Sequence, residues 1–256
     1  MKKVTAFVGS AHKWNTHNAA VQYMKNLQAL GEVETEIVTL SDYRLGICRG
    51  CRVCFEKGEA RCPLKDDRDV LMDKIAASDG VVFATPNYTW GMSGMMKVFL
   101  DRFGFICHRP RYFGKVCTSI VVQAMGRGEV IVDTLEFTGM TLGFNSMKGI
   151  TITAWDPRTE KQQKKIDQDL VAHSKRFYAQ LTRPAGAAPT LYQLAVFRMA
   201  RSGIKKQADP NSLDYHYYAD HGWFQSDYFY PTRLNLFQRA AGHLMDEMAP
   251  LMQKMM

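Results

Sequence analysis

The chain has 256 residues, of which 46% are hydrophobic and 23% are charged, and its formal net charge is +8. This length and composition indicate an ordinary globular protein with one large domain, or one domain with an appendage. The basic residues are dispersed and no nucleic-acid-binding motif accompanies them, so we expect no nucleic acid as a partner. The longest apolar stretches have the length of strands, so we expect no membrane span.

The N-terminal segment predicts a strand, a loop and a helix. An apolar run at residues 4–8 is followed by the sequence GSAHKWNT, and Ala20, Met24, Leu27 and Leu30 then recur at helical spacing. Two lysines precede the apolar run, but the run is too short for the hydrophobic region of a signal peptide and no A-x-A cleavage site follows. We therefore expect a cytoplasmic protein whose thiols stay reduced.

Strand and helix patterns then alternate as far as residue 181. Further strands are expected at residues 33–40, 80–86, 115–123 and 149–155. Helices are expected at residues 66–77, 93–103 and 129–140, and a last helix carries Ile166, Leu170, Phe177 and Leu181. This alternation predicts an α/β fold: a doubly wound, five-stranded parallel sheet of order 2-1-3-4-5, covered by helices on both faces.

The C-terminal part has a different composition. Residues 183–190, with the sequence RPAGAAPT, predict a linker between a domain at residues 1–182 and a helical extension at residues 191–256. The extension is rich in aromatic residues, which argues against disorder because such side chains need a surface to bury against.

Near the C-terminus, apolar residues recur in alternate steps of three and four at Leu234, Phe237, Ala241, Leu244, Met248, Leu251 and Met255. We call this set the apolar stripe. Three roles fit it: packing on its own domain, a contact between subunits, or a helix on a membrane surface. Pro250 is expected to kink or end the helix near Ala249.

The most distinctive motif is C-x2-C-x2-C-x7-C, formed by Cys48, Cys51, Cys54 and Cys62. Gaps of two residues let a tight loop turn successive sulfurs inward, and the longer gap lets the chain close the fourth corner of an iron–sulfur cube. Bacterial ferredoxins use a related spacing, also followed by a proline, for such clusters. The cysteine loop, which we define as residues 46–63, is therefore a candidate site for a [4Fe–4S] cluster.

Other uses of the four thiols remain open. A zinc site usually pairs two C-x2-C elements that lie about a dozen or more residues apart. Disulfide frameworks belong to short secreted chains. Free thiols without a ligand are a further alternative.

Three loops are expected to meet at the carboxyl ends of the strands, where such sheets bind ligands. The loop after the first strand offers hydroxyl, amide and backbone N–H donors at a helix N-terminus, which suit a phosphate. The loop after the third strand, residues 86–93, combines amides and aromatic rings that can hold a ribityl chain and the edge of a flavin. The loop after the fourth strand, residues 123–128, has glycines that let backbone approach a flat ring. Each loop alone is a weak signal, because a capped helix start has similar residues.

Together these residues resemble the flavodoxin-like NADPH-dependent FMN reductases, and within them the iron–sulfur flavoproteins. The resemblance rests on GS-x-H-K-x-N-T, on the cysteine run ending in Asp66-Asp67, and on TPNY followed by Lys97-x-Phe99-x-Asp101-Arg102. It covers about residues 1–180 and implies non-covalently bound FMN. In the iron–sulfur members it also implies a [4Fe–4S] cluster on the four cysteines, with subunits paired.

The resemblance implies a set of flavin-binding residues. His12 stands where relatives usually carry arginine, so Lys13 and the backbone are expected to neutralise more of the phosphate charge. The implied cofactor-binding residues are Ser10, His12, Lys13, Asn15 and Thr16, then Pro86, Asn87, Tyr88, Thr89, Trp90 and Gly91, and finally Ala124, Met125 and Gly126.

We therefore expect an FMN-dependent oxidoreductase that passes electrons between FMN and a [4Fe–4S] cluster or redox partner, with no catalytic side chain. NAD(P)H or a ferredoxin-like protein is the expected donor, a small molecule is the expected acceptor, and a homo-dimer or larger assembly is expected. One alternative is a cluster-free NAD(P)H-dependent FMN or quinone reductase. The other is a non-enzymatic electron carrier or redox sensor. Arginines and lysines around the cysteines favour docking of an acidic ferredoxin, although Glu56, Glu59 and Asp66 dilute this charge.

Overall fold

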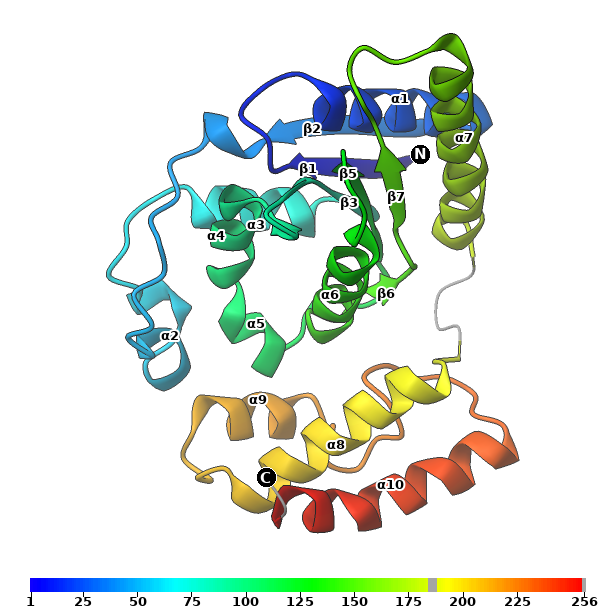
Figure 1. Cartoon of the computed structure of the whole chain (residues 1–256). Coiled ribbons are helices and arrows are strands. Elements are labelled where there is room, and N and C mark those ends of the chain that lie inside the picture. The colour runs from blue at the N-terminus through cyan, green and yellow to red at the C-terminus, as the bar shows by residue number, and fades with distance from the viewer. Residues whose placement is uncertain (184–187, 255–256) are drawn as a thin grey trace.

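A parallel sheet forms the centre of the computed structural model, which describes residues 1–183 and 188–254. The order β2-β1-β3-β5-β6 confirms the predicted order of strands (Figure 1). β7 also pairs with β5, so that β6 and β7 together occupy the last position of the order. β4 forms a short antiparallel hairpin with β3. The strands are β1 (Lys2–Val8), β2 (Val33–Thr39), β3 (Gly80–Tyr88), β4 (Gly91–Met92), β5 (Val116–Gln123), β6 (Asn145–Ser146) and β7 (Ile150–Thr153).

The predicted fifth strand is divided into two pieces. β6 pairs with the start of β5 at Val116 and Cys117, whereas β7 pairs with its end from Ile120 onward. Between them, Gly149 passes so close to Ser119 that a Cβ on the glycine would stand 2.0 Å from the serine Oγ. This close approach is the site at which regular pairing is interrupted.

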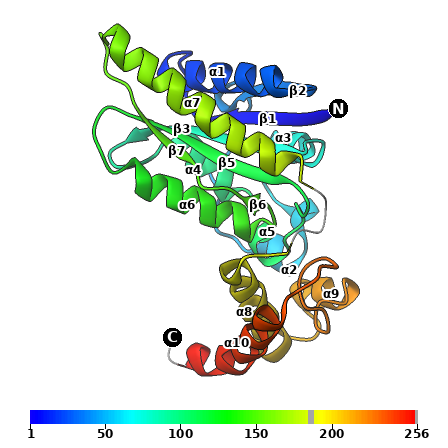
Figure 2. The same cartoon turned by 90° about the vertical axis from the view of Figure 1, so that its right-hand side faces the viewer.

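Helices cover both faces of the sheet (Figure 2). α1 and α7 bury Tyr23, Leu27 and Phe177 against one face. The helices α3 to α6 bury residues such as Leu71, Phe99 and Ile131 against the opposite face. Because both faces are covered, β3 and β5 are nearly continuous apolar runs. The helices are α1 (Asn15–Leu30), α2 (Val53–Glu56), α3 (Arg68–Ala76), α4 (Gly94–Asp101), α5 (Gly104–His108), α6 (Gly128–Thr141) and α7 (Glu160–Leu181).

The C-terminal extension consists of α8 (Leu191–Gln207), α9 (Leu213–Asp220) and α10 (Leu236–Lys254). Its aromatic residues form their own core, against which Phe113 of the sheet domain also packs. The extension lies next to α2 and α5 (Figure 2), and the Tyr217 hydroxyl donates to the Pro110 carbonyl at 2.9 Å. The middle of the predicted linker, residues 184–187, lies outside the described residues, so the division into domains stays a prediction.

α10 corrects one expectation and bears on the open role of the apolar stripe. The helix continues through Pro250 to Lys254, so it does not end near Ala249. Among the described side chains of the apolar stripe, Leu234 is buried, but Phe237, Leu244 and Met248 are 69%, 57% and 44% exposed and do not pack on their own domain. α10 instead turns Gly242 and Asp246 toward Arg198 of α8. Met255 lies outside the described residues. None of the described helices combines the length and the hydropathy needed to cross a bilayer.

A buried histidine joins the two helices on one face to the sheet. His173 of α7 lies between the Tyr23 hydroxyl, 2.9 Å from Nδ1, and the Lys148 carbonyl, 3.0 Å from Nε2. A carbonyl only accepts, so Nε2 carries the proton and Nδ1 accepts from Tyr23. Burial lowers the pKa of His173 to about 4. The imidazole is therefore neutral in the folded protein.

This histidine predicts a pH dependence of stability. Between about pH 6.5 and pH 4, the unfolded chain takes up a proton at His173 and the folded chain does not. The free energy of unfolding should therefore fall by about 3 kcal/mol as the pH drops through this window. Urea denaturation at several pH values measures the effect. His173→Gln should flatten the dependence, and an unchanged slope in that variant would contradict the assignment.

Candidate functional site

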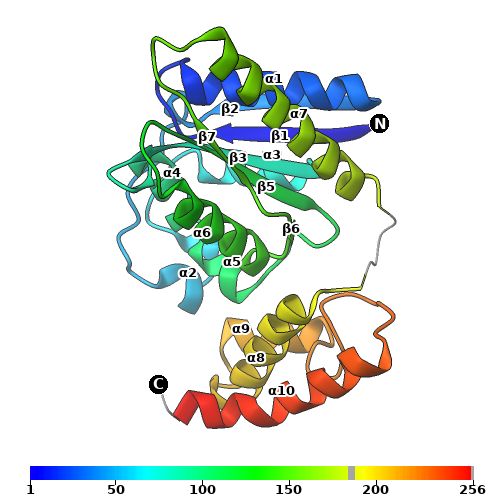
Figure 3. The same cartoon turned by 45° about the vertical axis from the view of Figure 1, so that its right-hand side comes forward.

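The three predicted loops lie side by side at the carboxyl ends of β1, β3 and β5 (Figure 3). The Gly9 N–H donates to the Ala84 carbonyl at 2.8 Å, and the Ser93 hydroxyl donates to the Gly9 carbonyl at 2.6 Å. On the other side, the Asn87 amide donates to Gln123 and to the Gly126 carbonyl, both at 3.3 Å. The β3 loop is thus hydrogen-bonded to both neighbouring loops.

The first loop requires glycine at position 9. A Cβ there would stand 2.8 Å from the Met96 Cβ and 2.9 Å from the Ser93 Oγ. Ser93 is also the N-cap of α4, since its Oγ accepts from the Met96 N–H at 3.1 Å. The turn at Gly9 therefore rests directly on the first turn of α4. Ser10 follows it, buried, with its hydroxyl donating to the His12 carbonyl.

The N-terminus of α1 is open to an anion. Trp14 occupies the N-cap position without a side-chain hydrogen bond, and the first turn holds no acidic residue. The first N–H groups of a helix have no partner inside the helix, and its dipole favours negative charge at this end. Thr16 is buried, while His12 and Lys13 are exposed beside this turn. The predicted phosphate residues are thus brought together.

Two residues beyond the predicted set contact this loop. The Asn15 side chain donates to the Asp156 carboxylate at 2.6 Å and accepts from the Arg158 guanidinium. Asp156 and Arg158 also pair with each other at 2.8 Å. They lie 141 and 143 residues from Asn15 along the chain, so only the fold reveals them.

The second loop is a tight hairpin with strained backbone. β3 and β4 are joined by Thr89 and Trp90 alone, whose φ angles are 51° and 58°. Positive φ at both positions is the geometry of a type I′ turn, which usually contains Asn or Gly. A β-branched or bulky residue there costs about 1 kcal/mol or more. The hairpin leaves Tyr88 and Trp90 exposed.

The third loop completes an aromatic and apolar surface. Ala124, Met125 and Gly126 are exposed, and the buried Gln123 accepts from the Gly128 N–H at 2.8 Å. Trp14 and Trp155, which follow β1 and β7, are exposed at this edge of the sheet as well.

These features fit a flavin mononucleotide. The uncapped helix end suits its phosphate, and the exposed aromatic residues suit its ring. The buried Oδ1 of Asn87 has no hydrogen-bond partner among the described residues, so it is an acceptor available to a bound N–H group.

The base of the cysteine loop is closed by a buried ion pair. Arg102, at the end of α4, pairs with Asp66 and also donates to the Gly46 carbonyl at 3.0 Å. The Asp66 carboxylate accepts from the Gly46 N–H at 2.8 Å. Burial would raise the pKa of Asp66, but Arg102 and the backbone donors hold it below its ordinary value. Asp66, which lies just beyond the loop, is therefore tied to the base of the loop, and α3 begins at Arg68 rather than at residue 66.

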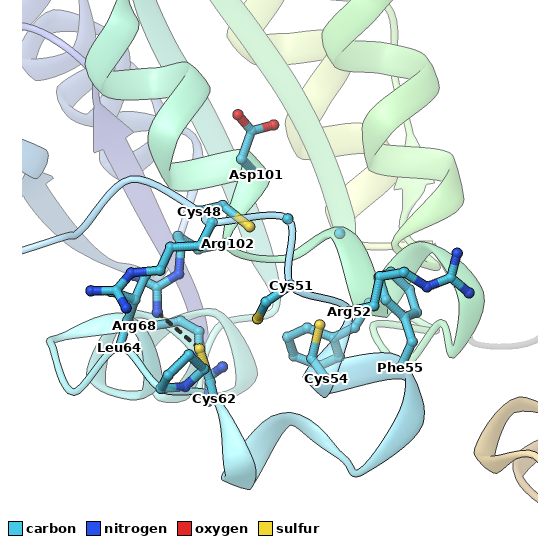
Figure 4. Close-up of a pocket in the computed structure, with 15 residues that line it drawn as sticks. Cys48, Cys51, Arg52, Cys54, Phe55, Cys62, Leu64, Arg68, Asp101 and Arg102 are labelled. Carbon is cyan, nitrogen blue, oxygen red and sulfur yellow. Dashed lines mark hydrogen bonds between the residues drawn. The ribbon is translucent and has the colours of Figure 1, made fainter.

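The four cysteines line one cavity, together with Phe55, Leu64 and the side chain of Arg102 (Figure 4). All four are free thiols: Cys48 and Cys51 are exposed, and Cys54 and Cys62 are half-buried. The Arg102 guanidinium donates to the Cys62 Sγ at 3.8 Å. Among the residues that the structure describes, no three His, Cys, Asp or Glu side chains are close enough to hold one metal ion.

Positive charge surrounds this cavity. The guanidiniums of Arg68, Arg109 and Arg111 lie 5.6, 5.8 and 5.2 Å from the centre of the Phe105 ring, which also lines the cavity. Burial, together with the neighbouring cysteines, raises the pKa of Cys54. The protein without a metal therefore keeps Cys54 as a thiol, although cationic groups that would stabilise thiolates are close by.

Comparison with known proteins identifies the family. A model of the NADPH-dependent FMN reductase family matches residues 2–154. An iron–sulfur flavoprotein of Archaeoglobus fulgidus is 36% identical over 131 residues, which is 50% of this chain and 58% of that protein. One from Methanocaldococcus jannaschii is 34% identical over 100 residues, which is 39% of this chain and 51% of that protein. This chain therefore spans little more than half the length of these two relatives.

Solved structures show the same fold. RosB with bound 8-demethyl-8-formylriboflavin-5'-phosphate matches with a TM-score of 0.59 at 13% identity, over 92% of both chains. An NAD(P)H:quinone oxidoreductase from Methanothermobacter marburgensis matches with a TM-score of 0.52 at 12% identity, over 68% of this chain and 98% of that chain. The likeness to RosB extends into the C-terminal extension. Because the family model matches more than half of the sequence, the chain belongs to the NADPH-dependent FMN reductase family.

Proposed function

We propose that the protein is an FMN-dependent oxidoreductase. The observation that carries the proposal is the meeting of three loops, with the β3 loop hydrogen-bonded to both neighbours, beside the uncapped N-terminus of α1. Membership of the FMN reductase family supports it. The bound FMN would supply the redox chemistry, by exchanging a hydride with NAD(P)H or single electrons with a partner.

The side chains of the site bind and orient rather than react. Ser10, His12, Lys13, Asn15 and Thr16 would hold the phosphate, with Arg158 adding charge through its contact with Asn15. The β3–β4 hairpin at residues 86–91 would hold the ribityl chain and ring, and residues 124–126 would close the other side. No side chain is required as a general acid, base or nucleophile.

We further propose that the cysteine loop holds a [4Fe–4S] cluster. In such a cluster each thiolate binds a different iron, so the four sulfurs need not converge on a single point, as they would for one zinc ion. Four thiols around one cavity, beside the buried cations Arg68 and Arg102, suit that requirement. The names of the iron–sulfur flavoproteins that this chain resembles point the same way.

A cluster-free NAD(P)H-dependent FMN or quinone reductase is the second candidate. It is favoured by the name of the family. It needs only the flavin site, so the two candidates differ in the role of the cysteines.

The surface of the cysteine loop suits an acidic, ferredoxin-like electron donor. Glu59 and Asp66 turn inward, where Arg111 and Arg102 neutralise them. They therefore do not dilute the outward charge. Glu56 remains exposed, against the exposed basic residues Arg44, Arg49, Arg52, Lys57, Arg61 and Lys65.

We also propose that subunits associate as a homo-dimer or larger assembly. The exposed apolar stripe of α10, with Phe237, Leu244 and Met248, favours this role over packing on its own domain. A contact between subunits would remove these side chains from water.

Anaerobic purification tests the cluster directly. We expect FMN together with about four irons and four sulfides per chain, and a broad absorption shoulder beside the flavin peaks. Cys62→Ser should lose iron and keep FMN. Cys107→Ser is the matched control, because the Cys107 Sγ contacts Thr141 rather than the cysteine loop. A protein that holds FMN but no iron, even after cluster reconstitution, would contradict the cluster proposal and leave the cluster-free reductase as the candidate.

The docking surface predicts a strong dependence on ionic strength. The rate of reduction by an acidic ferredoxin should fall at least about tenfold between low and high salt, because screening removes electrostatic steering. Arg49→Glu combined with Lys57→Glu should slow the reaction at low salt. Lys161→Glu combined with Lys164→Glu, which reverses two exposed charges on α7, is the control and should leave the rate unchanged. A rate that does not respond to salt would refute this surface.

The loop after β1 predicts that the protein distinguishes FMN from riboflavin by the phosphate of FMN. Arg158→Met should weaken FMN binding about tenfold, the loss expected for one charge-assisted interaction. Riboflavin lacks the phosphate, so its affinity should not change. Flavin fluorescence titration measures both constants. Equal losses for the two ligands would show that the variant deforms the loop, and that Arg158 does not act on the phosphate.

A further inference from the structure

The C-terminal extension reaches the cysteine loop through one arginine. Arg109, which follows α5 and is 4% exposed, shares its guanidinium among three partners, one of which is the Glu59 carboxylate of the loop, 3.3 Å from Nη2. Nη2 donates to the Cys54 carbonyl at 2.7 Å, and Nη1 donates to the Asp214 carboxylate of α9 at 2.5 Å. A backbone atom of a cysteine in the loop is thus linked to a side chain of the extension.

Asp214 is held in place on its own side. Its second oxygen accepts from His108 Nδ1 at 2.8 Å, and its helix begins with Ser212 as an N-cap. Burial would raise the pKa of Asp214, but His108 and Arg109 hold it below its ordinary value. The carboxylate is therefore ionised at neutral pH, and it orients Arg109 toward the loop.

Two further contacts hold the segment that follows Cys54. Phe55, the residue after Cys54, packs its ring against His108 with centroids 4.7 Å apart. Leu213 of α9 lies at Gly58, where a Cβ would stand 3.9 Å from the leucine Cδ1. The extension therefore touches the segment that carries Cys54, whereas Cys48 and Cys51 are exposed on the part of the loop before it.

We propose that the C-terminal extension is a clamp on the cysteine loop, and that Asp214 is the positioning residue through which it fixes Cys54. The loop has little regular structure of its own, only the four-residue α2 and a single 3-10 turn at Glu59–Arg61. Its conformation therefore depends on contacts made from outside. The clamp deepens the proposed function, because an ordered Cys54 is a condition for holding a cluster.

The clamp is tested first on the protein without metal, where the readout does not depend on iron. Trypsin releases Cys48, Cys54 and the buried Cys117 in separate peptides, LGICR, VCFEK and VCTSIVVQAMGR. Mass spectrometry after timed treatment with iodoacetamide then gives the alkylation rate of each thiol. Asp214→Ala should accelerate alkylation of Cys54 by about tenfold, the change expected when one charged hydrogen bond is lost. The rates of Cys48 and Cys117 should stay the same.

Two further variants make the result specific. Asp220→Ala, at the exposed end of the same helix, should leave all three rates unchanged. Asp214→Glu keeps the charge and should restore most of the protection of Cys54. An unchanged Cys54 rate in Asp214→Ala would overturn the clamp. Acceleration of Cys117 together with Cys54 would show general unfolding, and it would overturn the clamp as well.

The second readout uses the reconstituted protein. Iron should pass to a chelator about tenfold faster from Asp214→Ala than from the parent protein, with FMN content unchanged. Equal rates of iron loss would overturn the role of Asp214 in holding the cluster. If the parent protein binds no iron, the cluster proposal fails and the alkylation rates alone decide on the clamp.

Discussion

The buried ion pair between Arg102 and Asp66 is the interaction on which the cysteine loop depends. It joins the end of α4 to the chain beyond the last cysteine, and Arg102 also holds Gly46, ahead of the first. Removing one partner of such a pair costs about 3–5 kcal/mol, because it leaves the other charge buried and uncompensated. The pair therefore closes a long loop whose own residues form few hydrogen bonds. It also brings a cation to the Cys62 sulfur.

A second guanidinium repeats this arrangement further along the loop. Arg102 holds the base of the loop at the Gly46 carbonyl, and Arg109 holds its middle at the Cys54 carbonyl. Arg102 pairs with Asp66, just beyond the loop, whereas Arg109 pairs with Glu59 of the loop and with Asp214 of the extension. A surface loop rich in thiols is thus placed by buried charges rather than by secondary structure. Glu59 and Asp66 face these buried arginines, whereas Glu56 and the basic residues of the loop face the solvent.

The sequence was sufficient where local patterns decide the structure. Alternating strand and helix patterns predicted the order of strands, and the end of each strand predicted which loops would meet. Contacts between distant residues were not predictable. Asn15 contacts Arg158, which lies 143 residues away in the sequence, and Arg109 contacts Asp214, which lies 105 residues away. No local pattern signals either pair. The apolar stripe was ambiguous for a related reason: the same period fits a helix packed inward or outward, and only the position of α8 shows that much of it faces outward.

α4 contributes to both candidate sites, because its two ends serve different loops. Ser93 at its N-terminus supports Gly9 beside the proposed flavin, and Arg102 at its C-terminus supports the cysteine loop. Eight helical residues span about 12 Å. The helix thus acts as a rigid spacer, and the separation between the two candidate sites is set by the length of one short element. Substitutions in either loop can change what is bound there, while the distance between a flavin and a cluster held at these two sites would stay nearly constant.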